Sequence, residues 1–516
     1  MKNPIVIHPF LFAIYPLLFL FSHNIEQISF IQILIPLTIM LCLIFLLIFL
    51  SRIIFRDKYK TAVIISVAII LFFSYGHIYN LIMDLYIGSF EIGRHRYLWF
   101  AWALLFTFTT YQTLRTQRSL HKFTNILNII ALSLFIFSIF NIGIYEFKTV
   151  SNKQDNFKSM DIIKATNTTA NDVPILRDIY YIILDGYASS NTLRDVYNFD
   201  NQNFTSYLKS KDFYIAHKSR SNYPLSFLSI ASSLNMKYIN YLTDVIGQEG
   251  TDPTLPYHLI QNSQVMGFLK KNGYKYVHFS SGYGPTNRNK YADLDIHGLG
   301  LGSEFISMVA QTTMLKTFDA LILGFERKKI LDTFSKLGKI HQIEGPKFIF
   351  AHIVSPHHPY LFDKNGEPVP GTSLKMKEGT GIWEQRENYI NQLIFINKKV
   401  QKLIEDILLK SKIPPIIIIQ ADHGSASSFS GHYGSESWKH PSETMLKERM
   451  RILNTYYLPL NGTNLLYESI TPVNTFRLVF DFYFNTNYGL IDDESYYSSY
   501  GRPYKFTNVT DSVTYK

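Results

Sequence analysis

Five long apolar segments in the first 145 residues constrain the fold of this chain more than any other feature. Each is close to the length of about 20 residues that a helix needs to cross a bilayer. The first segment runs on into further apolar sequence instead of ending at a small-residue cleavage site, which argues against a removable signal peptide. The sequence therefore predicts a transmembrane domain over residues 1–145 with five helices, at roughly 5–21, 29–50, 62–83, 97–113 and 123–145.

The loops between these segments predict the orientation of the chain. Lysine and arginine collect in the loops on the cytoplasmic side of a membrane. They are frequent at 51–61 and 114–122 and missing at 22–28. This pattern predicts a multi-pass protein of the plasma (inner) membrane, in a bacterial envelope, with a cytoplasmic N-terminus. Five crossings then leave everything after residue 146 outside the cytoplasm.

A few polar residues lie within or beside the predicted spans. They are His8, His77, Asn80 and Asn128. We interpret them as residues that hold helices together, and a polar pathway through the membrane is the alternative.

Charge and cysteine content exclude several classes of function. The 516 residues carry a net charge of +10, which would fit either nucleic acid or anionic lipid. No stretch of the distal part interleaves basic residues with aromatics, so no nucleic-acid partner is expected. Cys42, within an apolar run, is the single cysteine, so the rest of the chain has no disulfide, zinc-thiolate site or cysteine nucleophile.

The remainder of the chain predicts a linker followed by an α/β domain. Residues 146–175 are polar and read as a tether, and residues 176–516 alternate strand-like and helix-like stretches. The expected strands are 178–185, 346–356 and the run "IPPIIIIQAD", and the expected helices are 192–210, 226–239 and 384–410. Continuous apolar strands that alternate with helices indicate a mostly parallel sheet covered on both faces.

Two of these strands end in the same way, with an acid and then a glycine nearby. "YYIILDG" leads into Asp185, and "IIIIQADHG" leads into Asp422 and His423. Parallel sheets bind ligands outside the carboxyl ends of their strands, so these side chains are expected to face one crevice. Gly186 and Gly424 are expected to let the backbone turn away there. Oxygen and imidazole ligands without thiolate favour one divalent metal ion, zinc or manganese before magnesium.

A serine-rich stretch between these strands supplies a candidate nucleophile. In "SRSNYPLSFLSIASSLN", Ser226 begins the expected helix. The helix N-terminus and a nearby metal both favour the serine alkoxide over the alcohol. Ser221 and Ser229 are the alternative nucleophiles.

Taken together, these motifs resemble the alkaline phosphatase superfamily in its sulfatase-like membrane branch, which includes lipoteichoic acid synthases and phosphoethanolamine transferases. The family joins five membrane helices to an extracytoplasmic catalytic domain. There, a first acid, a threonine nucleophile and an Asp-His pair bind one metal ion. The resemblance carries these roles onto Asp185, Ser226, Asp422 and His423, with serine in place of threonine at the start of "SFLS".

The resemblance also implies substrate-binding histidines. In "AHIVSPHHPY", His357 corresponds to the residue that binds the substrate phosphate, with His352 and His358 as rivals. His432 corresponds to a histidine near the leaving group. The segment "ERMRILNTYYLP" resembles the same branch without an assigned role.

The sequence thus predicts a membrane-anchored, metal-dependent phosphoryl-group transferase or hydrolase. It would act on phosphodiester head groups, expected to be lipid-linked, through a covalent phospho-serine. One alternative is a sulfuric ester hydrolase, although "NYPLS" has Asn222 and Ser226 where a formylglycine motif needs Cys and Arg. Another alternative is a non-catalytic envelope protein whose degenerate domain binds a glycan or a protein. The sequence leaves the oligomeric state open.

Overall fold

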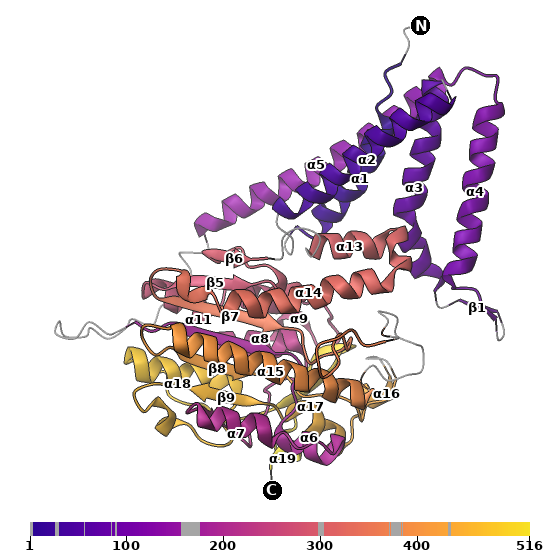
Figure 1. Ribbon diagram of the computed structural model, residues 1–516. Helices are drawn as coiled ribbons and strands as arrows, with labels where there is room; N and C mark the ends of the chain where they lie inside the picture. Colours follow the sequence, from indigo (N-terminus) through magenta and orange to yellow (C-terminus); the bar gives the residue numbers. More distant parts are fainter. Residues whose placement is uncertain are drawn as a thin grey trace. The chain divides into compact units, whose positions relative to one another are not determined.

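The computed structural model describes residues 4–25, 30–55, 57–83, 85–87, 90–155, 176–297, 304–370, 372, 383, 385–431 and 435–515. The chain forms two compact units (Figure 1). The first comprises residues 1–163 and 299–325, and the second comprises residues 164–298 and 326–516.

The first unit is helical, and its described helices follow the apolar segments of the sequence. Three of them are long and apolar enough to cross a membrane, over Gln32–Ser51, Lys58–Ile82 and His121–Ile144. The predicted span at 5–21 is a shorter apolar helix, and the one at 97–113 lies in a helix that does not meet the same criterion. The helices are α1 (His8–His23), α2 (Ile31–Phe55), α3 (Lys58–Ile82), α4 (His95–Arg115) and α5 (His121–Asp155); a short hairpin pairs β1 (Tyr86–Ile87) with β2 (Phe90–Glu91).

Two of the polar residues in this unit join helices to one another. The Nδ1 atom of His8 on α1 lies 2.6 Å from the hydroxyl oxygen of Ser66 on α3. The side-chain oxygen of Asn128 on α5 accepts a hydrogen bond of 3.0 Å from the backbone N–H of His8. These contacts have the helix-packing role that the sequence predicted for them.

A segment from the middle of the distal sequence also belongs to this unit. It contains α13 (Glu304–Thr312) and η2 (Met314–Thr317), and α14 (Asp319–Leu337) begins in it. Phe305 of α13 is fully buried in one cluster with residues of α1, α2, α3 and α5. A Cβ atom at Gly76 of α3 would lie 2.4 Å from the backbone carbon of Thr312, so glycine is required where α3 and α13 meet. Residues 299–325 fall within the range 176–516 predicted for the outer domain, but they belong to the helical unit.

The second unit is built on a seven-stranded sheet in the order β4-β9-β8-β3-β7-β5-β6. Neighbouring strands from β8 through β3, β7 and β5 to β6 are parallel, whereas β9 is antiparallel to both of its neighbours. The predicted α/β fold with a mostly parallel sheet is therefore confirmed. The strands are β3 (Ile179–Leu184), β4 (Tyr214–Ile215), β5 (Lys275–Phe279), β6 (Leu294–Ile296), β7 (Lys347–Ile353), β8 (Ile416–Gln420) and β9 (Asn454–Tyr457).

The apolar strands are buried because helices cover both faces of the sheet. All residues of β3, β7 and β8 are buried. Tyr181, Phe350 and Ile418 pack in one cluster with residues of α8 (Ser226–Asn235), α11 (Gln264–Lys271) and α18 (Pro472–Phe484). The long helix α15 (Arg386–Lys410) lies across the other face (Figure 1). Fully burying an isoleucine side chain stabilises the fold by about 1.5–3 kcal/mol.

The remaining elements of the second unit are short helices and one pair of strands. The helix expected over 192–210 is divided in two, because Asn198 adopts a left-handed conformation (φ 52°) that ends the first part. The elements are α6 (Ser190–Tyr197), α7 (Gln202–Ser210), α9 (Leu242–Ile246), α10 (Thr254–Gln261), α12 (Gly284–Asn287), η3 (Ile340–Gln342), α16 (Glu436–Lys439), α17 (Glu443–Met450), η4 (Gly462–Leu465), β10 (Tyr496–Ser499), β11 (Arg502–Asn508) and α19 (Thr510–Val513).

Candidate active site

Asp185 lies at the centre of the carboxyl end of the sheet. It directly follows β3, whose two neighbours are β7 and β8. Its backbone N–H donates to the carbonyl of Ile353 (3.0 Å), and its own carbonyl accepts from the N–H of His357 (3.0 Å). These bonds fix the ends of β3 and β7 to each other, so the Asp185 carboxylate has a defined position at the strand tips.

Asp422 and His423 follow the neighbouring strand β8. One carboxylate oxygen of Asp422, Oδ1, accepts hydrogen bonds from the backbone N–H groups of His423 (2.9 Å) and Gly186 (3.2 Å). These bonds hold the carboxylate from behind and leave Oδ2 facing the imidazole of His423, whose Nε2 atom is 3.4 Å away. The two strand tips therefore bring their acids together, at the place where the sequence predicted a crevice.

The two glycines of these motifs act in different ways. Gly186 has a φ of +72° and makes the turn after Asp185. Gly424 is needed for close packing, because a Cβ atom there would lie 2.2 Å from the carbonyl oxygen of Glu448. Gly186 therefore turns the backbone as expected, and Gly424 is required for close packing directly after the bend at Asp422 and His423.

Ser226 is the first residue of α8, and its hydroxyl points at the same crevice. Its Oγ atom lies 3.1 Å from Nε2 of His423. Ser229, one turn later, donates to the carbonyl oxygen of Asp422 (2.7 Å), which fastens the helix to the metal-ligand candidates. Ser221 instead contacts the sulfur of Met450 (3.6 Å). Of the three serines, Ser226 is the one beside the histidine of the crevice.

Two carboxylate oxygens in the crevice have no hydrogen-bond partner in the described part of the chain. Asp185 Oδ1 and Asp422 Oδ2 are both buried and make no hydrogen bond to any residue that the structure describes. Both lie close to His423 Nε2, at 3.5 and 3.4 Å. Buried carboxylates are costly unless paired or bound to a cation, so this set of atoms, together with the Ser226 hydroxyl, fits a divalent metal ion.

Two further histidines stand around the same carboxylates. Ligand atoms of Asp185, His357 and His423 lie within 4.8 Å of one another, and so do those of Asp185, His352 and Asp422. Nε2 of His352 is 3.4 Å from Asp185 Oδ2. Nδ1 of His357 lies 2.6 Å from the carbonyl oxygen of His358, which leaves its Nε2 for a ligand.

The histidines predicted to bind the substrate can now be located in the structure, except His432. His357 lies at the crevice, as expected for a substrate contact, and His358 holds it through its carbonyl. His352, which sequence reasoning treated only as a rival of His357, comes from the buried strand β7 beside β3. A histidine inside an otherwise apolar strand was the signal that could have identified it. His432 lies outside the described residues.

The electrostatics of the crevice favour cation binding. Burial acts against ionisation of Asp185, but His357, His352 and His423 together lower the pKa of this carboxyl below its ordinary value. Burial, and after it the charge of Asp185, raise the pKa of Asp422. Burial, together with the nearby Arg449, holds the pKa of His423 well below its usual range, so the imidazole is neutral. A neutral imidazole is the form that binds a metal.

Arg449 and Glu448, at the end of α17, were not identified as functional from the sequence. Arg449 is fully buried. Its Nε and Nη1 atoms donate to the carbonyl oxygens of Pro224 (2.9 Å) and Gly424 (3.1 Å), and its Nη2 atom has no hydrogen-bond partner among the described residues. Arg449 thus joins the backbone beside Ser226 to the backbone beside His423. It also leaves one buried guanidinium nitrogen for an anion.

Glu448 fixes the loop that follows the Asp-His-Gly motif. Its carboxylate accepts hydrogen bonds from the hydroxyl of Ser425 (3.0 Å), the N–H of Ser428 (2.9 Å) and the hydroxyl of Tyr197 (3.0 Å). The segment "ERMRILNTYYLP" therefore contributes the carboxylate of Glu448, which positions the loop, and the guanidinium cation of Arg449 beside the crevice.

Comparison with known proteins gives one family match and several distant structural ones. Residues 226–452 match the family model described as Sulfatase. No curated protein matches the chain in sequence.

The similar solved structures share little sequence with this chain. The C-terminal periplasmic domain of EcEptC from Escherichia coli, in complex with Zn, covers 59% of this chain and 82% of its own, at 13% identity and a TM-score of 0.37. The integral membrane protein lipooligosaccharide phosphoethanolamine transferase A (EptA) from Neisseria meningitidis covers 88% and 89%, at 12% identity and a TM-score of 0.35. The putative sulfatase yidJ from Bacteroides fragilis covers 61% and 75%, at 13% identity and a TM-score of 0.36. At such scores the likeness indicates nothing further about chemistry.

Proposed function

We propose, from the premise that this chain carries a sulfatase-like hydrolase or transferase domain of the alkaline phosphatase superfamily, that it acts on phosphodiester head groups of membrane lipids. Ser226 is the nucleophile. Asp185, Ser226, Asp422 and His423 hold one divalent metal ion, zinc or manganese. The observation that carries this proposal is the pair of buried, unpartnered carboxylate oxygens that face His423 beside the Ser226 hydroxyl.

The proposed reaction has two steps. The oxygen of Ser226 attacks phosphorus, the bond from phosphorus to the lipid alcohol breaks, and the head group remains on Ser226 as a phosphodiester. Water or an acceptor hydroxyl then attacks phosphorus, and the bond to Ser226 breaks. When bound, the metal ion stabilises the serine alkoxide and the charge that develops on the phosphoryl oxygens.

The other polar groups bind the phosphoryl oxygens and the leaving group. His357 contacts the substrate phosphate through Nε2, and His432 keeps the leaving-group role that the family resemblance implies. The N-terminus of α8, which begins at Ser226, offers backbone N–H groups to an anionic oxygen. Arg449, whose Nε atom donates to the carbonyl of Pro224 two residues before Ser226, adds a cationic donor through Nη2.

A mass spectrum of the covalent intermediate tests the nucleophile. Wild-type protein incubated with phospholipid gains the mass of the head-group phosphate on the peptide that contains Ser226. Ser226→Ala gains no such mass and loses turnover by a factor of about 10³ or more, while its metal content stays unchanged. Ser210→Ala is the matched control, because Ser210 is an exposed serine of α7. Full activity of Ser226→Ala would show that another residue attacks.

Two other functions remain to be separated from this one. The family match with sulfatases keeps sulfuric ester hydrolysis as a second candidate, and turnover of an aryl sulfate faster than of the corresponding phosphodiester would establish it. Wild-type protein that binds no metal at all would instead indicate a non-catalytic envelope binding protein.

The topology is part of the proposal: five crossings, a cytoplasmic N-terminus and an extracytoplasmic catalytic domain. Replacing Cys42 with serine and exposed Lys412 with cysteine gives a chain with one accessible thiol. A membrane-impermeant maleimide should label that thiol in intact spheroplasts. Labelling only after lysis would contradict this orientation.

A further inference from the structure

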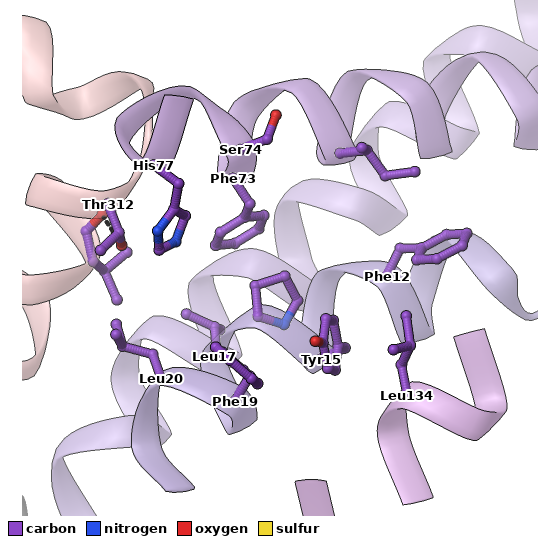
Figure 2. A pocket seen from close by; sticks show the side chains of 13 residues that line it. Phe12, Tyr15, Leu17, Phe19, Leu20, Phe73, Ser74, His77, Leu134 and Thr312 are labelled. Carbon is purple, nitrogen blue, oxygen red and sulfur yellow. Dashed lines mark hydrogen bonds between the residues drawn. The ribbon is translucent and has the colours of Figure 1, made fainter. Parts of the chain in front are cut away.

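A pocket lies wholly within the helical unit, away from the residues of the crevice. It encloses about 470 Å³ between α1 and α3, with contributions from α5 and α13. Figure 2 shows Phe73, Ser74 and His77 of α3 opposite Tyr15, Leu17, Phe19 and Leu20 of α1. The remaining lining residues are Phe12, Pro16, Ile70, Leu134, Val309 and Thr312. The volume is in the range of roughly 300–1,000 Å³ that small-ligand sites occupy.

The two ends of this pocket differ in polarity. At one end, Phe12 and Leu134 lie close together, and Ile70 contributes to the apolar lining (Figure 2). At the other end, His77 faces Thr312 of α13 (Figure 2). Among the described residues, none is found in a hydrogen bond with the imidazole of His77. The pocket is thus apolar along its length with a free polar group at one end.

The polar end also lies next to a cation. Lys316 of η2 donates a hydrogen bond to the side-chain oxygen of Asn80, and Asn80 lies three residues after His77 on α3, on the same helical face. Lys316 also stands over the ring of Tyr79, at 5.4 Å. A ligand with an apolar tail and an anionic head therefore fits this pocket in one direction only.

The predicted topology determines which end of the pocket faces the outer leaflet. With a cytoplasmic N-terminus, α1 runs outward from His8 to His23, so Leu20 lies nearer the outer face than Phe12. The chain then returns through α2, and α3 runs outward from Lys58 to Ile82, so His77 also lies nearer the outer face than Ile70. The polar end of the pocket thus faces the outer leaflet, where lipid head groups lie.

From these observations we propose that the pocket between α1 and α3 binds one acyl chain of an outer-leaflet phospholipid, with the phosphate at the end where His77 and Thr312 lie and with Lys316 nearby. This proposal rests on the proposed function in one respect, namely that the bound lipid is the substrate. The sequence supplies the connection, because α13 is inserted between β6 and the part of α14 that belongs to the catalytic unit. Binding of a lipid at α13 is thereby linked along the chain to the sheet.

The pocket is tested by photo-crosslinking on the full chain in lipid nanodiscs. The probes are phosphatidylethanolamine and phosphatidylglycerol, each with a diazirine near the end of one acyl chain. Adducts are expected on the peptides that contain Phe12–Leu20 and Ile70–His77. Leu20→Trp fills the pocket from α1 and should reduce these adducts about tenfold. Adducts spread evenly over the exposed faces of all helices would overturn the proposal, because they would show ordinary surrounding lipid.

Matched variants separate the pocket from general damage to the membrane unit. Leu46→Trp makes the same change on a half-exposed, lipid-facing position of α2 and should leave the adducts unchanged. Ile70→Trp fills the pocket from α3 and replaces Leu20→Trp if that variant does not fold. Adducts that persist in both filled variants would contradict the proposal.

Kinetics distinguish the pocket from the proposed function. Leu20→Trp should raise KM for a long-chain phospholipid about tenfold and leave the hydrolysis of a short, water-soluble phosphodiester unchanged. An equal change for both substrates would refute a role in lipid binding. Ser226→Ala should give the same adducts as wild type. If wild type forms the adducts and turns over no phosphodiester, the lipid site stands and the proposed activity falls.

Discussion

The acids at the two ends of β3, the partly buried Asp178 and the buried Asp185, differ in their partners. Asp178, just before the strand, forms a short ion pair with Lys347 of β7 (2.7 Å) and accepts a second bond from the N–H of the same residue (3.1 Å). Asp185, just after the strand, has a carboxylate oxygen without a hydrogen-bond partner among the described residues. A carboxylate that has its own partner stabilises the fold. A carboxylate without one, 3.5 Å from a neutral histidine, requires a ligand.

The largest effect on activity is expected at the carboxyl end of the sheet, from replacing Arg449, whose Nη2 atom has no hydrogen-bond partner among the described residues. Arg449→Gln should lower kcat/KM by about 10²–10³, the loss that follows removal of one transition-state donor. The bound metal should remain. Isothermal titration of the metal-loaded protein with inorganic phosphate should show weaker binding, which a purely structural role for Arg449 would not predict. Unchanged phosphate affinity would remove Arg449 from the site.

At the amino end of β3, a substitution should lower the stability of the fold and leave the activity unchanged. Asp178→Asn leaves Lys347 largely buried without its counter-charge and should reduce the free energy of unfolding by roughly 3 kcal/mol, measured by urea denaturation. Metal content and turnover of the folded fraction should stay at the wild-type level. Loss of metal in this variant would show that the two ends of the sheet are not independent.

A smaller effect is expected from restoring the residue that the related families use. Ser226→Thr keeps the hydroxyl beside His423 and adds one methyl group, so activity should stay within about tenfold of wild type. Steady-state kinetics with a soluble phosphodiester measure this directly. A loss as deep as that of Ser226→Ala would indicate that the position is not a nucleophile, or that the crevice excludes the methyl group.

Much of the second unit could be predicted from the sequence because its signals are local. Apolar runs that end in an acid identified β3 and β8, and the parallel architecture placed their tips side by side. The start of α8 at Ser226 followed from the proline just before it and the small residues after it. The sequence could not give the strand order, which decides that β7 is the other neighbour of β3 and brings His352 to the crevice.

Other features depend on distant contacts that no local pattern reveals. Residues 304–312 have an ordinary amphipathic pattern, and the burial of Phe305 and the close approach of Thr312 to Gly76 show that they pack with the helices of the first unit. Gly424 was predicted as a turn residue, and the local sequence does not reveal that the backbone of Glu448 packs too closely against it for a side chain. Arg449 was hidden because a buried arginine resembles a surface one in sequence until its partners, Pro224 and Gly424, are known.

The metal content of Asp422→Asn tests most directly whether the acids at the strand tips hold a cation. The asparagine oxygen can still accept from the N–H groups of His423 and Gly186, while the free oxygen is replaced by an amide nitrogen. Purified wild type should contain close to one zinc or manganese per chain, and Asp422→Asn should contain almost none, with a metal-free melting temperature no lower than that of metal-free wild type. A full complement of metal in Asp422→Asn would contradict the account.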